Sequence, residues 1–222
     1  MANSLSKGTA LITGASRGIG AVYADRLAKR GYDLILVARD EARLKTLSVR
    51  LASETGRSIT PLPADLNHKT DLAKVESVLR DDRTITMLVN NAGIASVAPL
   101  LDADVEKMDE MIALNITALT RLIYAAAPAF VARGAGTIIN IASVVGISPE
   151  TLNGVYGASK AYVIALSHSL QHELADGHPH PGRAAGRDCD RPLGKRRPPM
   201  AEAAPIDRHV AGGHGRCSAG RA

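Results

Sequence analysis

The sequence has little of what marks disulfide-stapled, metal-binding or membrane-spanning proteins. Its only two cysteines, Cys189 and Cys217, lie near the C-terminal end without CxxC spacing, so neither a disulfide framework nor a zinc site is favoured. The N-terminus lacks a basic segment followed by a long apolar stretch, and no window approaches the ~18 apolar residues that a membrane span needs. We therefore expect a soluble cytoplasmic protein that binds no metal and enters no membrane.

Net charge is also missing from most of the chain. The total is +5, but residues 1–176 hold 18 Lys and Arg against 18 Asp and Glu, and the last 46 residues hold 9 basic and 4 acidic side chains. The basic excess that suggests a nucleic-acid partner therefore belongs to the C-terminal segment alone. A chain of 222 residues with 45% hydrophobic residues fits one domain with a buried core.

Apolar runs and helical patterns alternate along residues 1–176. The runs fall at 9–13, 32–38, 58–66, 85–93 and 136–143, and helical patterns follow them from about 18, at 39–56, near 69–80, and over about 105–132 and 156–175. Continuous apolar runs are typical of parallel strands covered on both faces. Five strands interleaved with helices predict an α/β fold with a doubly wound parallel sheet, the Rossmann fold. Its ligand crevice is expected at the carboxyl ends of the strands, where the strand order reverses.

The first apolar run ends in a glycine-rich turn, TGASRGIG, from Thr13 to Gly20. Its glycines, at 14, 18 and 20, allow positive φ angles and close approach of a ligand to the backbone. The helix that follows offers unpaired N–H groups and a partial positive charge to a pyrophosphate. The spacing differs from the common GxGxxG, and by itself it also fits a tight strand-to-helix turn without a ligand. Its place after the first strand favours a dinucleotide-binding loop.

The end of the second run bears on which dinucleotide would bind. A carboxylate there accepts a hydrogen bond from a ribose 2′-hydroxyl, whereas a cation pairs with a 2′-phosphate. The run ends in Ala38 and Arg39, Asp40 lies one step later, and Arg17 of the glycine loop can reach the same region. Two cations favour NADP, with NAD still possible. In the alternative interpretation both arginines are solvated surface charges, and Asp40 is the N-cap of the next helix.

Three residues near the fifth run suggest proton transfer. Ser143 precedes Tyr156 by 13 residues, and Lys160 follows Tyr156 by four, which places Tyr156 and Lys160 on one helix face. A tyrosine is ordinarily a poor acid at neutral pH, and a nearby cation favours its ionised form. Ser143 could hydrogen-bond a substrate carbonyl while Tyr156 delivers the proton. Taken singly, Ser143 also fits a helix cap, and a tyrosine beside a lysine occurs on many helices.

These segments together resemble the short-chain dehydrogenase/reductase family over residues 5 to about 176. The resemblance is carried by TGASRGIG, NNAG at 90–93, Asn115, Ser143 and YGASK at 156–160, which follow in the family's order and spacing. It implies a catalytic tetrad of Asn115, Ser143, Tyr156 and Lys160, with Asn115 holding a water of the proton relay. The cofactor-binding residues that it implies are Gly14, Ser16, Arg17, Gly18, Ile19, Gly20, Arg39, Asp65, Leu66, Asn91, Ala92, Gly93, Tyr156 and Lys160.

The resemblance also implies an activity and a mode of assembly. The expected function is an NADP(H)-preferring oxidoreductase that interconverts a small-molecule carbonyl and a secondary alcohol by hydride transfer, with Tyr156 as acid and base. A homo-oligomer could form through the helices predicted at 105–132 and 156–175. Asn115 taken alone would be interpreted as a polar residue that satisfies helix backbone, and only the joint spacing makes a catalytic role the stronger hypothesis.

The resemblance stops near residue 176. Family members continue with a sixth strand, a Pro-Gly turn and a seventh strand, but residues 177–222 hold 8 Gly, 6 Pro, 8 Arg and 4 His with four large aliphatics, too few for two buried strands. Three interpretations are open: a disordered extension, a basic nucleic-acid arm that lacks aromatics for stacking, and a shifted reading frame, which we favour because the change is abrupt. The alternative function is then an inert family member that at most binds a nucleotide or a protein partner.

Overall fold

The computed structural model describes residues 6–151 and 154–174. By its internal contacts the chain divides into two compact units, Met1–His178 and Pro179–Ala222, and every described residue belongs to the first. The predicted tail at 177–222, with its three interpretations, lies outside the described residues. So does the boundary that the composition suggests at residue 176, which stays a prediction.

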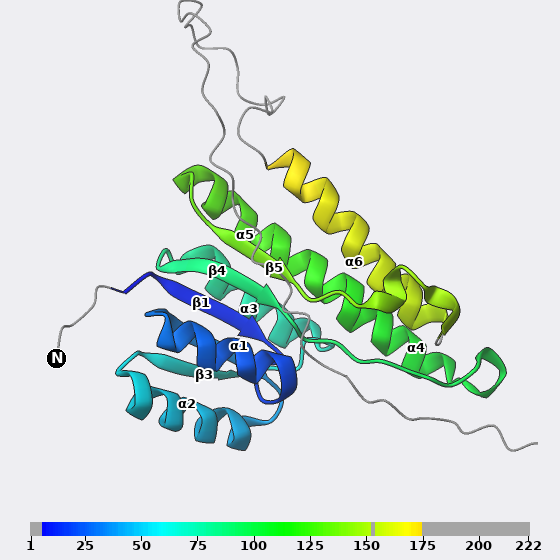
Figure 1. Ribbon diagram of the computed structural model, residues 1–222, viewed down its shortest axis with the longest axis horizontal. Helices are drawn as coiled ribbons and strands as arrows, with labels where there is room; N and C mark the ends of the chain where they lie inside the picture. Colours follow the sequence, from blue (N-terminus) through cyan, green and yellow to red (C-terminus); the bar gives the residue numbers. More distant parts are fainter. Residues whose placement is uncertain (1–5, 152–153, 175–222) are drawn as a thin grey trace, which may run out of the picture. The chain divides into compact units, whose positions relative to one another are not determined.

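The described residues form one parallel sheet of five strands, and this confirms the predicted fold class (Figure 1). The strands are β1 (Thr9–Thr13), β2 (Asp33–Ala38), β3 (Ile59–Pro63), β4 (Ile85–Asn90) and β5 (Thr137–Asn140). Their order in the sheet is β3-β2-β1-β4-β5. The order reverses between β1 and β4, and such a reversal opens a crevice at the carboxyl ends of the two strands. Within the described residues β5 pairs only with β4.

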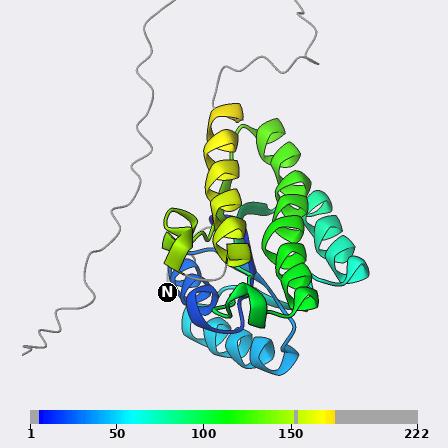
Figure 2. The same ribbon diagram turned by 90° about the vertical axis from the view of Figure 1, so that its right-hand side faces the viewer.

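The described residues form six α-helices: α1 (Gly18–Lys29), α2 (Glu41–Thr55), α3 (Lys69–Asp81), α4 (Val105–Ile112), α5 (Leu119–Arg133) and α6 (Gly154–Glu173). One buried cluster joins α1 and α2 to one face of the sheet. A second joins α3 and α5 to the opposite face, and a third packs α6 beside α5, as Figure 2 shows. Helices on both faces explain why the strands are apolar throughout rather than alternating.

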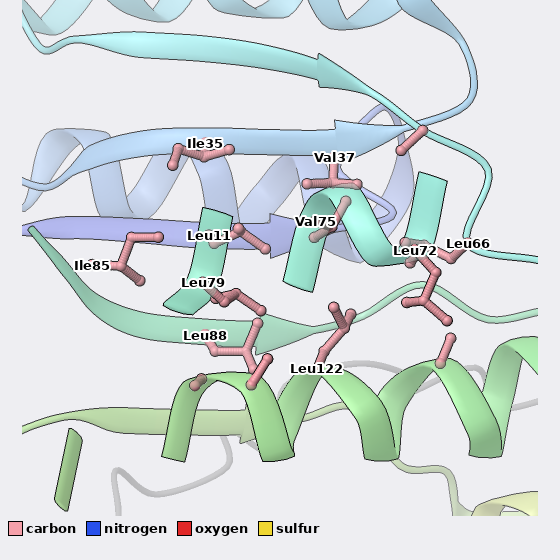
Figure 3. Close-up of a cluster of buried hydrophobic side chains, with 14 of the residues drawn as sticks. Leu11, Ile35, Val37, Leu66, Leu72, Val75, Leu79, Ile85, Leu88 and Leu122 are labelled. Carbon is pink, nitrogen blue, oxygen red and sulfur yellow. The ribbon is translucent and has the colours of Figure 1, made fainter. Parts of the chain in front are cut away.

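The cluster beneath α3 and α5 shows how the sequence pattern becomes a core (Figure 3). Leu11 of β1 and Leu88 of β4 are fully buried against Val75 of α3 and Leu122 of α5. Full burial of such a side chain stabilises the fold by roughly 1.5–3 kcal/mol. These contacts pack α3 and α5 against β1 and β4, the paired strands whose ends flank the crevice.

The helix predicted at 105–132 is present but contains a wider turn. Between α4 and α5 the chain forms a π-helical turn, η2 (Ala113–Ala118), a feature that often marks functional positions. The helical stretch Val105–Arg133 is long and apolar enough to cross a membrane by length and composition alone, so the expectation that no window reaches this length was wrong. The core helix of a soluble protein passes the same test, and 44% of the apolar window is buried inside the protein, so length and composition alone do not assign a membrane span.

Candidate active site

A cavity of about 610 Å³ opens at the carboxyl ends of β1, β2 and β4, where the reversal of strand order predicts it. We refer to it as the strand-end cavity. Its lining residues are Gly14, Ser16, Arg17, Gly18, Ile19, Val37, Ala38, Arg39, Asp40, Arg43, Ala64, Asp65, Leu66, Asn91, Ala92, Gly93, Ile94 and Leu114. All the residues predicted to bind the cofactor are among them except Gly20, Tyr156 and Lys160.

The glycine loop is locked to the loop after β4 by a set of short contacts. The buried hydroxyl Oγ1 of Thr13 accepts hydrogen bonds from the backbone N–H groups of Asn91 and Ala92, both at 3.0 Å. Asn91 Nδ2 donates back to the carbonyls of Thr13 and Gly14 at 3.0 and 3.1 Å. A Cβ added to Gly20 would lie 2.4 Å from the Gly14 carbonyl oxygen, so only glycine lets helix and loop approach this closely.

The N-terminus of α1 faces this cavity with its backbone donors available to an anion. Its N-cap residue, Arg17, has extended backbone and makes no side-chain capping bond, and the first turn has no acidic residue. Gly14 and Gly18 both have positive φ angles, 64° and 56°, which direct the loop around the helix end. Uncapped N–H groups and the helix dipole suit a phosphate.

Three arginines and two carboxylates surround the end of β2. Arg17, Arg39 and Arg43 all line the cavity. Asp40 is the N-cap of α2: its Oδ1 accepts the Arg43 N–H at 3.0 Å, and its Oδ2 lies 3.1 Å from Arg43 Nε. Asp65 Oδ2 lies 3.9 Å from Arg39 Nη1. The N-cap interpretation of Asp40 was therefore correct for its backbone contact, although Asp40 lines the cavity as well.

Asn115 lies in the middle of η2 and is almost fully buried. Its Oδ1 accepts the Ile94 N–H at 3.0 Å, while Nδ2 donates to the Ile94 carbonyl at 2.9 Å and to Ser159 Oγ at 3.1 Å. Both amide hydrogens are thus used, and one lone pair of Oδ1 remains to accept a hydrogen bond from a water. Ile94 and its neighbour Gly93 line the strand-end cavity, so Asn115 supports the cavity wall from behind.

Lys160 projects from α6 toward the same wall and is 7% exposed. Its ammonium donates to the Ile141 carbonyl at 2.8 Å, just beyond the end of β5. Burial lowers the pKa of the Lys160 side chain because loss of water disfavours its charged form. A Cβ at Gly93 would lie 3.1 Å from Asn115 Oδ1 and 3.7 Å from Lys160 Nζ. Gly93 therefore lies in the cavity wall and directly beside the two predicted catalytic residues.

Ser143 and Tyr156 lie on the two segments that meet beside Lys160. Ser143 directly precedes the short 3₁₀ turn η3 (Val144–Gly146), and Tyr156, half-buried, stands in the first turn of α6. The turn packs tightly on the helix: a Cβ at Gly146 would lie 2.7 Å from the backbone carbonyl carbon of Lys160. This contact holds the segment of Ser143 against the helix that carries Tyr156.

Sequence reasoning missed several residues of the site. They are Thr13, Arg43, Ile94, Leu114 and Ser159. Arg43 could have been found, because it lies one helical turn after Asp40 and must face the same end of the sheet. Thr13 belongs to the glycine motif, but its hydroxyl accepts a hydrogen bond from a loop 78 residues away, a pairing that no local spacing predicts.

The glycine loop, the uncapped α1 and the strand-end cavity define a nucleotide-binding α/β protein. The chain belongs to the short chain dehydrogenase family, whose model matches residues 8–178. An uncharacterized oxidoreductase of Staphylococcus epidermidis is 35% identical over 167 residues, which cover 75% of this chain and 71% of that protein. The family membership expected from the motifs is confirmed.

Two solved structures are closely similar. A short-chain dehydrogenase from Sphingobium yanoikuyae in complex with NADPH shares 52% identity at a TM-score of 0.74, over 75% of this chain and 66% of that one. A bulky-bulky ketone specific alcohol dehydrogenase from Comamonas testosteroni shares 47% identity at a TM-score of 0.75, over 77% and 68%. The chain thus spans about two thirds of the length of these structures.

Proposed function

We propose that this chain is an NADP(H)-preferring oxidoreductase that interconverts a small-molecule carbonyl and a secondary alcohol. The observation that carries the proposal is the junction at Gly93, where the wall of the strand-end cavity meets Asn115 and the Lys160 ammonium. A nucleotide bound at the glycine loop would then reach the groups suited to proton transfer. Family membership and the NADPH complex of a relative 52% identical support the same function.

The residues present fit a dinucleotide phosphate. The α1 N-terminus has no side-chain cap and no acid in its first turn, and Gly14 and Gly20 leave no room for a Cβ beside it. Arg17, Arg39 and Arg43 would surround a 2′-phosphate. Asp40 is less suited to accept a ribose hydroxyl, because both of its oxygens already contact Arg43. This arrangement favours NADP over NAD.

A bound nicotinamide dinucleotide would supply or accept the hydride at the carbon of the reacting carbonyl or alcohol. Tyr156 transfers its phenolic proton to the carbonyl oxygen in reduction and takes it back in oxidation. Ser143 donates a hydrogen bond to that oxygen and holds it beside Tyr156. Lys160, fixed by the Ile141 carbonyl, favours the phenolate that remains after proton transfer. Its other N–H groups would bind the nicotinamide ribose, as the family resemblance implies.

Nucleotide binding and turnover of the full chain test this proposal. NADPH fluorescence should report saturable binding, and reduction of a ketone with apolar substituents should be measurable by loss of absorbance. Tyr156→Phe should retain NADPH binding but lose turnover by about 10²–10⁴-fold, since it removes the acid. A Tyr156→Phe variant with parental turnover would contradict the proposed acid. A parent that binds NADPH but reduces no ketone would support the inert alternative.

Replacement of Arg43, which lines the cavity beside Asp40, tests the cofactor preference. Arg43→Gln should weaken NADPH binding by about tenfold or more, because a charge-assisted contact to the 2′-phosphate is lost, and should leave NADH binding nearly unchanged. Lys45→Gln is the matched control, because Lys45 is an exposed cation of the same helix and lies outside the cavity lining. Equal losses for NADPH and NADH in Arg43→Gln would contradict the assignment.

A further inference from the structure

We infer that Ser159 is a positioning residue whose buried hydroxyl fastens helix α6 to the wall of the strand-end cavity through Asn115. Ser159 belongs to the YGASK segment, yet neither the glycine loop nor the proposed proton transfer uses it. Its side chain is fully buried. The inference rests on the proposed function only for its effect on turnover, since the contacts themselves exist without any ligand.

The hydroxyl of Ser159 makes two hydrogen bonds, one as a donor and one as an acceptor. It donates its hydrogen to the Tyr156 carbonyl at 2.8 Å, within α6. Because a hydroxyl has a single hydrogen, it can meet Asn115 only as an acceptor, and Asn115 Nδ2 donates to it at 3.1 Å. Ser159 thus connects the backbone of the proposed acid to a side chain of the π-helical turn η2.

Asn115 carries this connection to the cavity. Its Oδ1 accepts a hydrogen bond from the Ile94 N–H, and the second hydrogen of Nδ2 is donated to the Ile94 carbonyl. Two hydrogen bonds therefore fix the backbone of one residue of the cavity wall. The orientation of the amide is fixed by all three bonds together. Removal of the Ser159 hydroxyl would leave a buried N–H of Asn115 without a partner, a state that favours reorientation of the amide.

Reorientation of Asn115 would release Ile94 and the backbone next to Gly93. That backbone lies beside the Lys160 ammonium, so its position decides how a nucleotide in the cavity meets the groups on α6. The bridge of Ser159, Asn115 and Ile94 therefore aligns the nucleotide-binding wall with the helix of Tyr156 and Lys160. Ser159 touches neither substrate nor nucleotide in this assignment and acts through Asn115.

The same helix offers a matched control in Ser167, two turns further on. Ser167 Oγ likewise donates to a carbonyl of its own helix, that of Val163 at 2.7 Å, and accepts a hydrogen bond from an asparagine, Asn140 Nδ2, at 3.0 Å. Neither Asn140 nor Ser167 lines the strand-end cavity. Ser167→Ala therefore removes an equivalent pair of bonds without touching the wall.

Amide hydrogen exchange of the full chain, followed by NMR without nucleotide, tests the bridge. In Ser159→Ala the Ile94 amide should exchange about tenfold faster than in the parent. In Ser167→Ala its rate should stay within about twofold. Ser159→Cys keeps a weaker acceptor of similar size and should give an intermediate rate, which also covers the case in which Ser159→Ala does not fold. Unchanged protection of Ile94, or equal acceleration in both alanine variants, would overturn the inference.

Turnover gives a second readout that a general loss of stability would not reproduce. Ser159→Ala should lower kcat for ketone reduction by about tenfold while the KM for NADPH stays within about twofold, because misalignment affects the chemical step more than binding. Ser167→Ala should retain parental kcat. A parent that fails to bind NADPH would overturn the proposed function alone, since the exchange comparison needs no ligand.

Discussion

The proposed chemistry needs Lys160 as a cation, but its buried position disfavours the charge. Burial on α6 lowers the pKa of its ammonium, and the Ile141 carbonyl holds it through one strong hydrogen bond. The sequence predicted the residue from its four-residue spacing after Tyr156, because helix periodicity is local. It did not predict the degree of burial, which depends on how η3 and the loop at Gly93 pack around the side chain.

The pH dependence of stability should reveal this burial. Since the folded state binds the Lys160 proton less tightly than the unfolded state, the unfolded chain holds more protons between the lowered pKa and ~10.4, and the free energy of unfolding rises with pH in that window. Urea unfolding over a series of pH values rising to ~10 should therefore show the parent gaining stability relative to Lys160→Met. Lys45→Met, which replaces an exposed lysine, should follow the parent. Parallel curves for Lys160→Met and the parent would contradict the burial of the charge.

At the scale of elements, one carboxylate ties α3 to α5. Glu76 on α3 has a side chain only 7% exposed, and it accepts hydrogen bonds from Arg121 Nε on α5 and from Arg80 Nη1 one turn later on α3, the latter at 3.3 Å. The polar helical pattern near 69–80 predicted the helix but gave Glu76 no role, because its buried position arises only where α3 packs against α5. A buried carboxylate is retained at low cost only while its partners are present.

Arg121→Met should lower the free energy of unfolding by about 1–2 kcal/mol, because the buried Glu76 carboxylate then has Arg80 as its remaining ion-pair partner. The loss is limited because the Arg121 side chain is half-exposed to water. Urea unfolding measures it. The double variant Glu76→Met with Arg121→Met should lie closer to the parent than the two single losses added together, since it removes the buried charge. Additive losses would indicate that the two side chains do not interact.

The elements themselves were the part most open to prediction. All five strands lie within their predicted apolar runs, and α3 begins at Lys69 as expected. Gly56 caps α2 with a φ angle of 66°, and the helical pattern predicted at 39–56 ends at this glycine. The π-helical turn at Ala113–Ala118 was missed because its residues carry no local signal that separates such a turn from an ordinary helix. Its partner contacts come from Ile94 and Ser159, which are distant in sequence.

At the scale of the whole molecule, the outer helices are the surfaces through which two copies of the chain are predicted to associate. Oligomerisation through the segments at 105–132 and 156–175 stays a prediction. Exposed apolar side chains on them suit it: Tyr124 on α5 is 71% exposed and Val131 is 47% exposed. Apolar groups that gather on a helix face favour association when a second copy can cover them.

Tyr124→Glu should weaken self-association by about tenfold or more, because a carboxylate buried in an interface loses its hydration. Sedimentation velocity over a range of chain concentrations measures the change. Val49→Glu is the matched control: Val49 is equally exposed, at 71%, but lies on α2, on the opposite face of the sheet. A parent that sediments as a monomer throughout, or equal effects of the two variants, would contradict assembly through α5.

The sequence by itself determined the alternation of strands and helices, the glycine loop and the spacing of Ser143, Tyr156 and Lys160. Those features follow from backbone periodicity and from residue types that act within one or two turns of chain. Only the tertiary structure decided that Thr13 clamps the loop after β4, that Arg43 joins the arginines of the cavity, and that Ser159 holds Asn115. Each of these depends on hydrogen bonds or burial between segments brought together by sheet order, and such contacts leave no periodic signal in the chain.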